Sequence, residues 1–189
     1  MNLFLYSKQH KKLLLLLVIV LNSLVCFSQS FLGKTNNKVN FRSGPGTEYS
    51  IIKSLPKGSQ VFIIDSEISN DFYQIIDIGT NQYGFIHKDF LIFGEAVEKQ
   101  KGGQFTPNGS SNNYNPEIEI YNNTKIELTL RINSNNYSFR PQEKRKISLA
   151  SGKCDYIASA PGVIPSTGIE MLESNMSYTW QFYILTTKY

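Results

Sequence analysis

The sequence predicts an all-β fold made of two modules that a flexible linker joins. Apolar residues recur in short runs between turn signals, and no segment keeps the 3.6-residue period of an amphipathic helix. The chain contains 11 tyrosines and 12 phenylalanines, which favour β-strands. A stretch rich in Gly, Ser, Asn and Pro interrupts this pattern near the middle of the chain, and its composition predicts the division into two modules.

The first 28 residues have the order of charged, apolar and small residues that is typical of a secretory signal peptide. Three lysines precede an apolar run from Leu13 to Val25, and the small Ser28 suits the last position before a cleavage site. The run is shorter than the ~20 residues that span a bilayer. We therefore expect cleavage near Ser28 and an exported mature protein that is periplasmic, on the cell surface or extracellular.

Two other fates of this segment stay open. The apolar run is an uncleaved membrane anchor in the first, and Cys26 is lipidated in the second, although Val25 is bulkier than the residue usual before a lipidated cysteine. Cleavage after Ser28 would leave 16 basic and 15 acidic residues. This near balance lacks the strongly basic footprint of nucleic-acid binding. We expect no nucleic-acid partner and no stable membrane insertion after cleavage.

Five strands are expected in the first module, because strand-like runs alternate with turn signals there. They are Lys38–Arg42, Ile51–Leu55, Gln60–Ser66, Phe72–Ile78 and Tyr83–His87. Pro56–Ser59 is expected to form a tight turn in which Gly58 takes a positive φ. Gly79–Gln82 is expected to close a hairpin between the last two strands.

A series of glycine and aromatic motifs follows in order through this module. The motifs are Phe41-Arg42-Ser43-Gly44-Pro45-Gly46, Tyr49, Ile52-Lys53-Ser54-Leu55, Lys57-Gly58-Ser59-Gln60-Val61, Phe72-Tyr73-Gln74-Ile75, Gly84-Phe85-Ile86 and Lys88-Asp89-Phe90-Leu91. In this order they resemble the bacterial SH3 domain over residues 33–93, which implies a small SH3-like β-barrel. Phe72 and Phe85 replace tryptophans that are usual in the family, so an aromatic side chain is kept while the indole donor is lost.

The resemblance also predicts an irregularity in one strand. The family pattern buries Phe72 and Ile75 together, whereas strict alternation places them on opposite faces. A bulge or twist near Gln74 is therefore expected.

The same resemblance implies a ligand-recognition module. Domains of this type bind peptidoglycan stem or bridge peptides and sometimes other proteins, and aromatic grooves hold extended peptides by stacking and a few hydrogen bonds. We expect Arg42, Tyr49, Tyr73 and Tyr83 to form the ligand-binding surface. Two alternatives stay open: Tyr49 and Tyr73 are partly buried barrel residues, and Arg42 braces its own loop by donating to backbone carbonyls.

Residues 95–115 are expected to be the linker. Gly, Ser, Asn and Pro with isolated aromatic residues bury too little apolar surface to offset the entropy of ordering. A fully flexible chain of this length has ends about 25 Å apart on average. The two modules are expected to move fairly independently.

Residues 116–189 are expected to form a β-sandwich-like domain, because short strands and turns recur along them. The expected strands are Glu117–Tyr121, Ile126–Ile132, Tyr137–Arg140, Lys146–Leu149, Asp155–Ser159, Ile169–Leu172 and Tyr178–Leu185. Asn122–Lys125 is expected to be a hairpin turn, and Trp180 a core anchor. Residues 159–168 are expected to form a stiff loop that either exposes Val163 and Ile164 to a partner or folds them over the edge of the sandwich.

No set of residues in the expected mature chain is typical of a catalytic or metal site. Cys154 lacks a histidine base nearby in sequence, since His10 lies in the signal segment and His87 in the other module. We therefore expect Cys154 to be a buried apolar residue, with no catalytic residue, no metal and no cofactor.

These observations favour an exported, non-enzymatic binding or adaptor protein. Its SH3-like domain would recognise a cell-wall (peptidoglycan) peptide or an envelope protein. Two alternatives stay open: an accessory module of a cell-wall hydrolase system, and a structural spacer in a surface assembly.

Overall fold

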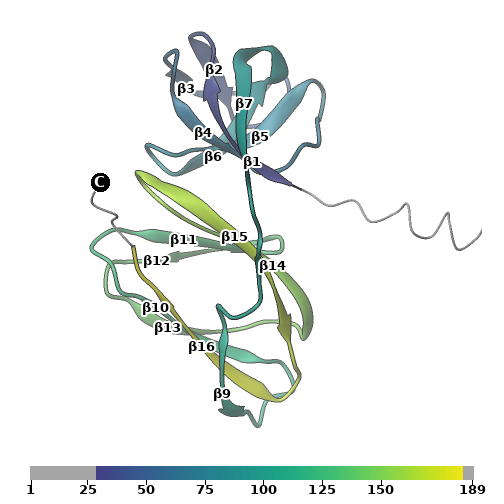
Figure 1. Ribbon diagram of the computed structural model, residues 1–189, viewed down its shortest axis with the longest axis vertical. Coiled ribbons are helices and arrows are strands. Elements are labelled where there is room, and N and C mark those ends of the chain that lie inside the picture. Colours follow the sequence, from purple (N-terminus) through teal and green to yellow (C-terminus); the bar gives the residue numbers. More distant parts are fainter. Residues whose placement is uncertain (1–28, 185–189) are drawn as a thin grey trace, which may run out of the picture.

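The computed structural model describes residues 29–184, which form β-strands and one short 3-10 helix without any α-helix (Figure 1). The all-β class predicted from the sequence is therefore confirmed. The expected signal peptide and the alternatives for Cys26 lie outside the described residues, as does the end of the last expected strand. Within residues 29–184, no helix is long and apolar enough to cross a bilayer.

The first domain is a seven-stranded antiparallel barrel with the strand order β3-β2-β6-β5-β4-β1-β7 (Figure 1). Its elements are β1 (Ser30–Thr35), β2 (Val39–Arg42), β3 (Ile51–Leu55), β4 (Gln60–Ile63), β5 (Phe72–Asp77), β6 (Gln82–His87), the 3-10 helix η1 (Lys88–Phe90) and β7 (Leu91–Val97). The five expected strands match β2 to β6. Gly58 has φ +84° in the turn after β3, as expected.

Strands β1 and β7 were absent from the sequence prediction. They pair with each other, and β1 also pairs with β4. The burial of β1 does not alternate along the strand, and β7 is exposed over most of its length. Neither strand therefore carries the apolar and polar alternation by which a half-buried strand is recognised.

The barrel core forms from one face of each central strand. Its buried residues are Val39, Phe41, Leu55, Val61, Ile63, Ile75, Ile86 and Leu91. Along β5, Ile75 belongs to this core, while Ile76 on the opposite face belongs to a second apolar cluster. The pairing of β5 with β6 is regular from Phe72 opposite His87 to Asp77 opposite Gln82. Of the bulge or twist expected near Gln74, the bulge is therefore wrong: the pairing is regular, and Phe72 and Ile75 are both buried although alternation places them on opposite faces of β5.

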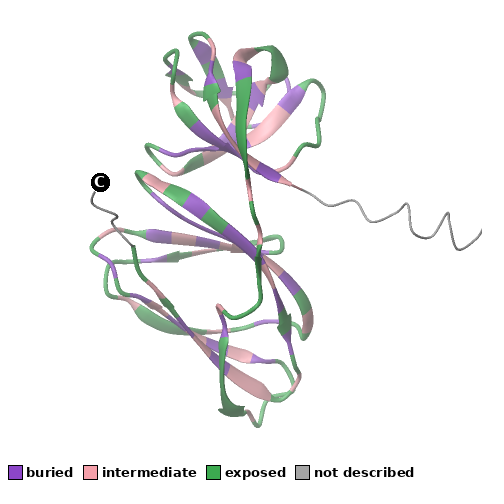
Figure 2. Cartoon of the chain, viewed as in Figure 1, coloured by how far each residue is buried: buried purple, intermediate pink, exposed green. Residues whose placement is uncertain are grey.

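The second domain is a sandwich of two sheets with the orders β13-β10-β16-β9 and β12-β11-β14-β15-β8. Its strands are β8 (Gln100–Lys101), β9 (Thr106–Ser110), β10 (Glu117–Asn122), β11 (Leu128–Ile132), β12 (Asn135–Phe139), β13 (Lys144–Ser148), β14 (Gly152–Ala160), β15 (Val163–Leu172) and β16 (Met176–Phe182). Figure 2 shows buried residues alternating with exposed ones along several of these strands. Trp180 packs in the shared core at 5.4 Å from Phe105 and 5.7 Å from Tyr156, centroid to centroid, as a core anchor.

Two expected turns of the second domain differ from the structure. Residues 122–125 connect β10 and β11, which belong to different sheets, so they do not close a hairpin. The expected loop at residues 159–168 is largely strand, because β14 and β15 form a long hairpin whose turn is Pro161-Gly162. Only this dipeptide carries the turn chemistry, and Gly162 supplies a φ of +74°.

The expected flexible linker also differs from the structure. Residues 95–115 contain the end of β7 and the strands β8 and β9, which pair with β15 and β16. Phe105 is 3% exposed and lies in the sandwich core. The buried carboxylate of Glu170 accepts a hydrogen bond of 2.8 Å from the backbone N–H of Gln104. One aromatic anchor and one buried acceptor tie down a stretch whose composition alone predicts disorder.

The barrel docks on the sandwich through an apolar cluster. Ile157 of β14 packs among barrel residues of β4, β5 and their flanks, namely Phe62, Ile64, Ile76 and Ile78. The β14–β15 hairpin rises from the sandwich toward the barrel (Figure 1), and the N–H of Gly162 at its tip donates to the carbonyl of Ile78 at 2.8 Å.

Polar contacts surround this cluster. The amide Nδ2 of Asn81 donates to Thr129 Oγ1 at 3.1 Å and to the Ser159 carbonyl at 3.4 Å. The two domains therefore meet over a mixed apolar and hydrogen-bonded interface, which differs from the independent motion expected of them.

Candidate ligand groove of the barrel domain

A groove of about 540 Å³ opens on the barrel, beside β2 and η1. Residues from five segments line it: Lys38, Val39, Asn40, Arg42, Thr47, Ser54, Phe72, His87, Asp89 and Phe90. Phe72 and His87 are paired at the open end of the β5–β6 hairpin, whereas the turn of that hairpin contacts the sandwich. Five residue steps of a strand separate the two ends by about 17 Å. The second domain therefore leaves the groove uncovered.

Arg42 fixes the loop on one side of the groove. Its Nη1 donates to the carbonyls of Thr47 at 2.9 Å and Tyr49 at 2.8 Å. The ring of Tyr49 lies against Gly44, where an added Cβ would stand 2.2 Å from Tyr49 Cδ1. This close approach explains the glycine before Pro45. Arg42 therefore braces its own loop, as one of the two alternatives expected. The same hydrogen bonds hold its guanidinium at the groove.

His87 forms the opposite wall. Its ring meets the rings of Phe72 and Phe90 edge to face, at centroid distances of 5.2 Å and 6.1 Å. His87 also caps η1, because its Nδ1 accepts the backbone N–H of Asp89 at 3.4 Å. In a neutral imidazole one nitrogen accepts and the other donates, so this bond assigns the proton to Nε2.

Asn40 and Ser54 lie opposite each other on β2 and β3. Ser54 Oγ donates to Asn40 Oδ1 at 3.1 Å. The amide oxygen of Asn40 therefore points to Ser54, and the NH₂ group of Asn40 takes no part in this contact. The groove therefore combines aromatic walls with polar groups in fixed positions.

Residues 37–92 match the family model of the bacterial SH3 domain. This match confirms the resemblance found in the sequence and ends before the sandwich domain. No curated protein and no solved structure matches the chain. The match suggests that the SH3-like domain is a binding module of a kind that is often related to the cell wall.

The structure separates the four residues expected to bind ligand. Arg42 lines the groove, whereas Tyr49 lies on the braced loop, is 42% exposed and does not line the groove. Tyr73 packs on the barrel core, with its ring 5.0 Å from that of Phe93. Tyr83 packs at the interface with the sandwich, where its hydroxyl lies 3.5 Å from Ser159 Oγ. Burial raises the pKa of the Tyr83 hydroxyl, and it outweighs the hydrogen bond with Ser159 and the positive charge of Arg131, which both lower that pKa.

Sequence reasoning missed most of the residues that line the groove. Asn40, Phe72 and His87 were read as parts of strands, and Asp89 and Phe90 as parts of the closing turn. Position is the signal for four of them: Phe72 begins β5, His87 ends β6, and Asp89 and Phe90 lie in η1, whereas Asn40 is the second residue of β2. Loop clusters at one end of a scaffold are frequent binding sites, and that rule would have selected those four.

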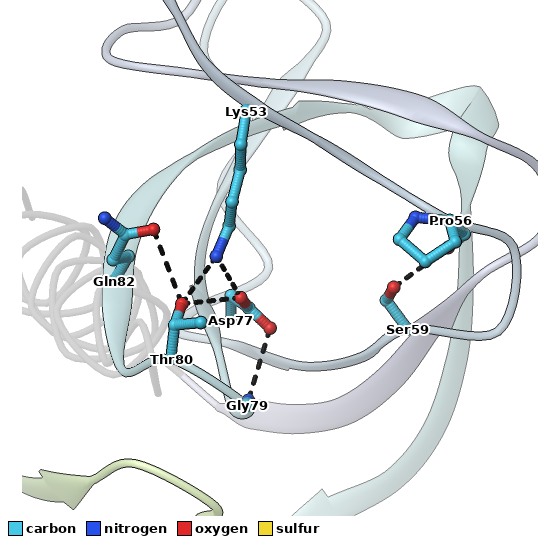
Figure 3. Close-up of polar contacts among 7 residues, drawn as sticks. All are labelled: Lys53, Pro56, Ser59, Asp77, Gly79, Thr80 and Gln82. Atoms are coloured by element: carbon cyan, nitrogen blue, oxygen red, sulfur yellow. Dashed lines mark hydrogen bonds and ion pairs between the residues drawn. The ribbon is translucent and has the colours of Figure 1, made fainter.

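A separate polar network fixes the hairpin turn that faces the sandwich (Figure 3). Lys53 Nζ lies 2.5 Å from Asp77 Oδ2 and donates to Thr80 Oγ1 at 2.6 Å, and Thr80 Oγ1 donates to Asp77 Oδ2 at 2.7 Å. Gly79 N–H donates to Asp77 Oδ1 at 3.2 Å. Asp77 is only 6% exposed. Burial alone would raise its pKa, but the hydrogen bonds from Lys53, Thr80 and Gly79 and the charge of Lys53 together lower it.

We expect Asp77→Asn to destabilise the SH3-like domain by about 1–3 kcal/mol at neutral pH, because a charged hydrogen-bonded group is lost. The folded state lowers the pKa of Asp77 below its ordinary 3.8. Its contribution is therefore fully present above that value and is lost as the pH falls through the lowered pKa. Urea unfolding at neutral pH and in strong acid checks this. The two proteins should converge in acid, whereas Asp65→Asn, at a carboxylate with one local bond to Glu67 N–H, should change stability little at either pH.

Cys154 lies in the sandwich core and is not disulfide-bonded. Burial, with smaller effects from Asp155 and Glu170, raises the pKa of its thiol to about 11. A thiol with that pKa is almost entirely protonated at neutral pH, and the thiolate is the reactive form. This agrees with the expectation of a buried apolar residue. Within residues 29–184, His, Cys, Asp and Glu form no group of three or more arranged to hold a metal ion.

We expect Cys154 to resist a thiol reagent such as Ellman's reagent in the folded protein at neutral pH and to react fully in denaturant. The first condition measures the buried, protonated thiol, and the second shows that the residue is chemically intact. Rapid reaction of the folded protein would show that the sandwich opens around β14 or that the thiol is ionised.

Proposed function

We propose that this chain is an exported, non-enzymatic binding protein whose SH3-like domain recognises a peptidoglycan peptide. The observation that carries the proposal is the groove itself. Phe72 and Phe90 supply aromatic surface in it, and Asn40 and His87 are among the polar groups that line it. An extended peptide needs this combination, because its backbone requires hydrogen bonds and its side chains require apolar contact.

The family of the SH3-like domain supports the choice of ligand. Its members are binding modules that often bind cell-wall components. The expected signal peptide supports export to the compartment where peptidoglycan lies. The protonated, buried state of Cys154 argues against a thiol nucleophile. Together these points favour binding over catalysis.

Cosedimentation with purified peptidoglycan sacculi tests the proposal. The mature chain should sediment with the sacculi, and Thr47→Trp should not, because the new indole would fill the groove. Thr47 is exposed and braces Arg42 only through its backbone carbonyl, so the substitution leaves the loop bonds in place. Lys57→Trp, at an exposed turn that does not line the groove, is the matched control.

Equal sedimentation of Thr47→Trp and the unchanged protein would contradict a role for the groove. The supernatants also test the hydrolase alternative. Steady release of soluble wall peptides by the purified chain would contradict a non-enzymatic function, whereas sedimentation without release agrees with it.

A further inference from the structure

Two neutral side chains of the groove, Asn40 and His87, present hydrogen-bond donors to a ligand, because an acceptor atom of each is already engaged within the protein. The amide oxygen of Asn40 accepts from Ser54 Oγ, so the NH₂ group is the part of that amide left for a ligand. The Nδ1 of His87 accepts from the N–H of Asp89, so its Nε2 carries a proton that can be donated. An amide and a neutral imidazole can each donate or accept a hydrogen bond. These contacts leave the donor side of both groups to the ligand.

Two cations add to these donors. Arg42 uses only Nη1 in its bonds to the loop carbonyls, and a guanidinium has five N–H groups. Those bonds also hold the guanidinium in place, so little conformational freedom is lost on binding. Lys38 lines the groove and is exposed. Both side chains favour an anionic partner, because hydrogen bonds to an ionised acceptor are about twice as strong as neutral ones.

One acid also lines the groove. The side chain of Asp89 is 70% exposed, and its Oδ2 lies 3.5 Å from His87 Nδ1. The backbone carbonyl of Asp89 accepts a hydrogen bond of 2.8 Å from Asn36 Nδ2, so this acid lies near the start of β2. It is one acid against the two cations Lys38 and Arg42. The hydroxyls of Thr47 and Ser54 serve as donors or acceptors. The balance of the groove is therefore donor-rich and basic.

We propose that the groove binds a carboxylate of an extended peptide, with Asn40, Arg42, His87 and Lys38 as the groups that hold it. The carboxylate site rests on the proposed function, because it uses the same groove. It adds to that function the chemical group of the ligand that the groove recognises. The carboxylate comes from a free peptide C-terminus or from an acidic side chain. Aromatic contact with Phe72 and Phe90 supplies the rest of the binding surface.

The chemistry of the ligand is tested with two pairs of probes on the mature chain. The first pair is soluble muropeptides before and after conversion of their carboxyl groups to amides. The second is acetyl-trialanine with a free carboxylate and with a C-terminal amide. Amide chemical shifts of the protein report the site. The carboxylate forms should shift Lys38, Asn40 and His87, and amidation should weaken binding at least about tenfold.

An isosteric substitution tests the donor argument in the protein. Asn40→Asp keeps an oxygen for Ser54 Oγ but turns the donating NH₂ into a carboxylate oxygen, so carboxylate binding should fall at least about tenfold. Asn37→Asp is the matched control, because it adds the same charge nearby at an exposed residue that does not line the groove. Its Oδ1 bond to the N–H of Lys38 is kept. Binding by this control should stay within about threefold.

The outcomes separate the two proposals. If acetyl-trialanine binds through its carboxylate and muropeptides do not bind, the carboxylate site stands and the peptidoglycan ligand is wrong. If muropeptides bind in the groove equally well as acids and as amides, the carboxylate site is wrong and the peptidoglycan ligand stands. If neither carboxylate probe shifts the groove residues, the carboxylate site is wrong. Equal binding by Asn40→Asp and the unchanged protein also contradicts it.

Discussion

Gly84→Ala is expected to unfold the SH3-like domain or to lower its melting temperature by more than about 10 °C. A Cβ at Gly84 would lie 2.5 Å from the Phe41 ring and 2.6 Å from the carbonyl oxygen of Arg42. The second of these atoms belongs to the backbone and cannot rotate away. Overpacking a filled core costs about 1–3 kcal/mol or more, and about 1 kcal/mol shifts the melting temperature of a domain this small by about 4–8 °C.

Gly79→Ala is the matched control for that experiment. Gly79 lies in the turn of the same β5–β6 hairpin, and the nearest atom to its added Cβ is Asp77 Oδ1 at 3.6 Å, an ordinary contact. Thermal unfolding followed by circular dichroism compares the two variants. A melting temperature for Gly84→Ala within a few degrees of that for Gly79→Ala would contradict the tight packing of β6 on β2.

Ile76→Asp is expected to separate the two domains while each stays folded. Ile76 is fully buried in the cluster at the domain interface and is not part of the barrel core. A carboxylate without a partner at that position costs several kcal/mol while the domains are docked, and it becomes solvated once they separate. The strand face that carries Ile76 does not support the barrel interior, so the barrel should survive.

Small-angle scattering and calorimetry measure this separation. The radius of gyration of Ile76→Asp should rise, and one unfolding transition should become two. Ile51→Asp is the matched control, because Ile51 is 52% exposed on β3 of the same domain. An unchanged radius with a single transition would show that the interface does not hold the domains together. Loss of the barrel fold would show that the two faces of β5 act as one core.

Strands were predictable where one local pattern determined them. Alternation and turn residues gave β3 with its observed ends, and Gly79–Gln82 was correctly assigned to the turn between β5 and β6. The family motifs predicted the barrel, and the match of residues 37–92 to the model of the bacterial SH3 domain confirms that resemblance. The prediction failed at β1, at β7 and in the stretch 95–115, where pairing with distant strands stabilises sequences that have little pattern of their own.

The contents of the groove depend on long-range register, which the sequence does not display. Asn40 becomes a donor only because β2 and β3 place it opposite Ser54. His87 becomes a donor only because η1 begins directly after it. Tyr83 was a reasonable surface residue of an isolated barrel, and it packs at the interface because the sandwich covers that face. Reasoning from one domain at a time could not find this.

Asn81 shows the same dependence on the second domain. It adopts a positive φ of 58° in the hairpin turn, which asparagine tolerates better than most residues, and this places its amide against the sandwich. The Asp77 network on the barrel side fixes the turn that presents it. A turn that the sequence marks only as a hairpin closure is therefore also the polar contact between the domains.

The most direct test of the central claim is a crystal structure of the mature chain with a soluble peptidoglycan stem peptide. We predict density for an extended peptide in the groove, in contact with Phe72 and His87 and with a carboxylate close to Asn40 and Arg42. A peptide bound elsewhere, for example against Tyr73 and Phe93 with the groove empty, would contradict this account.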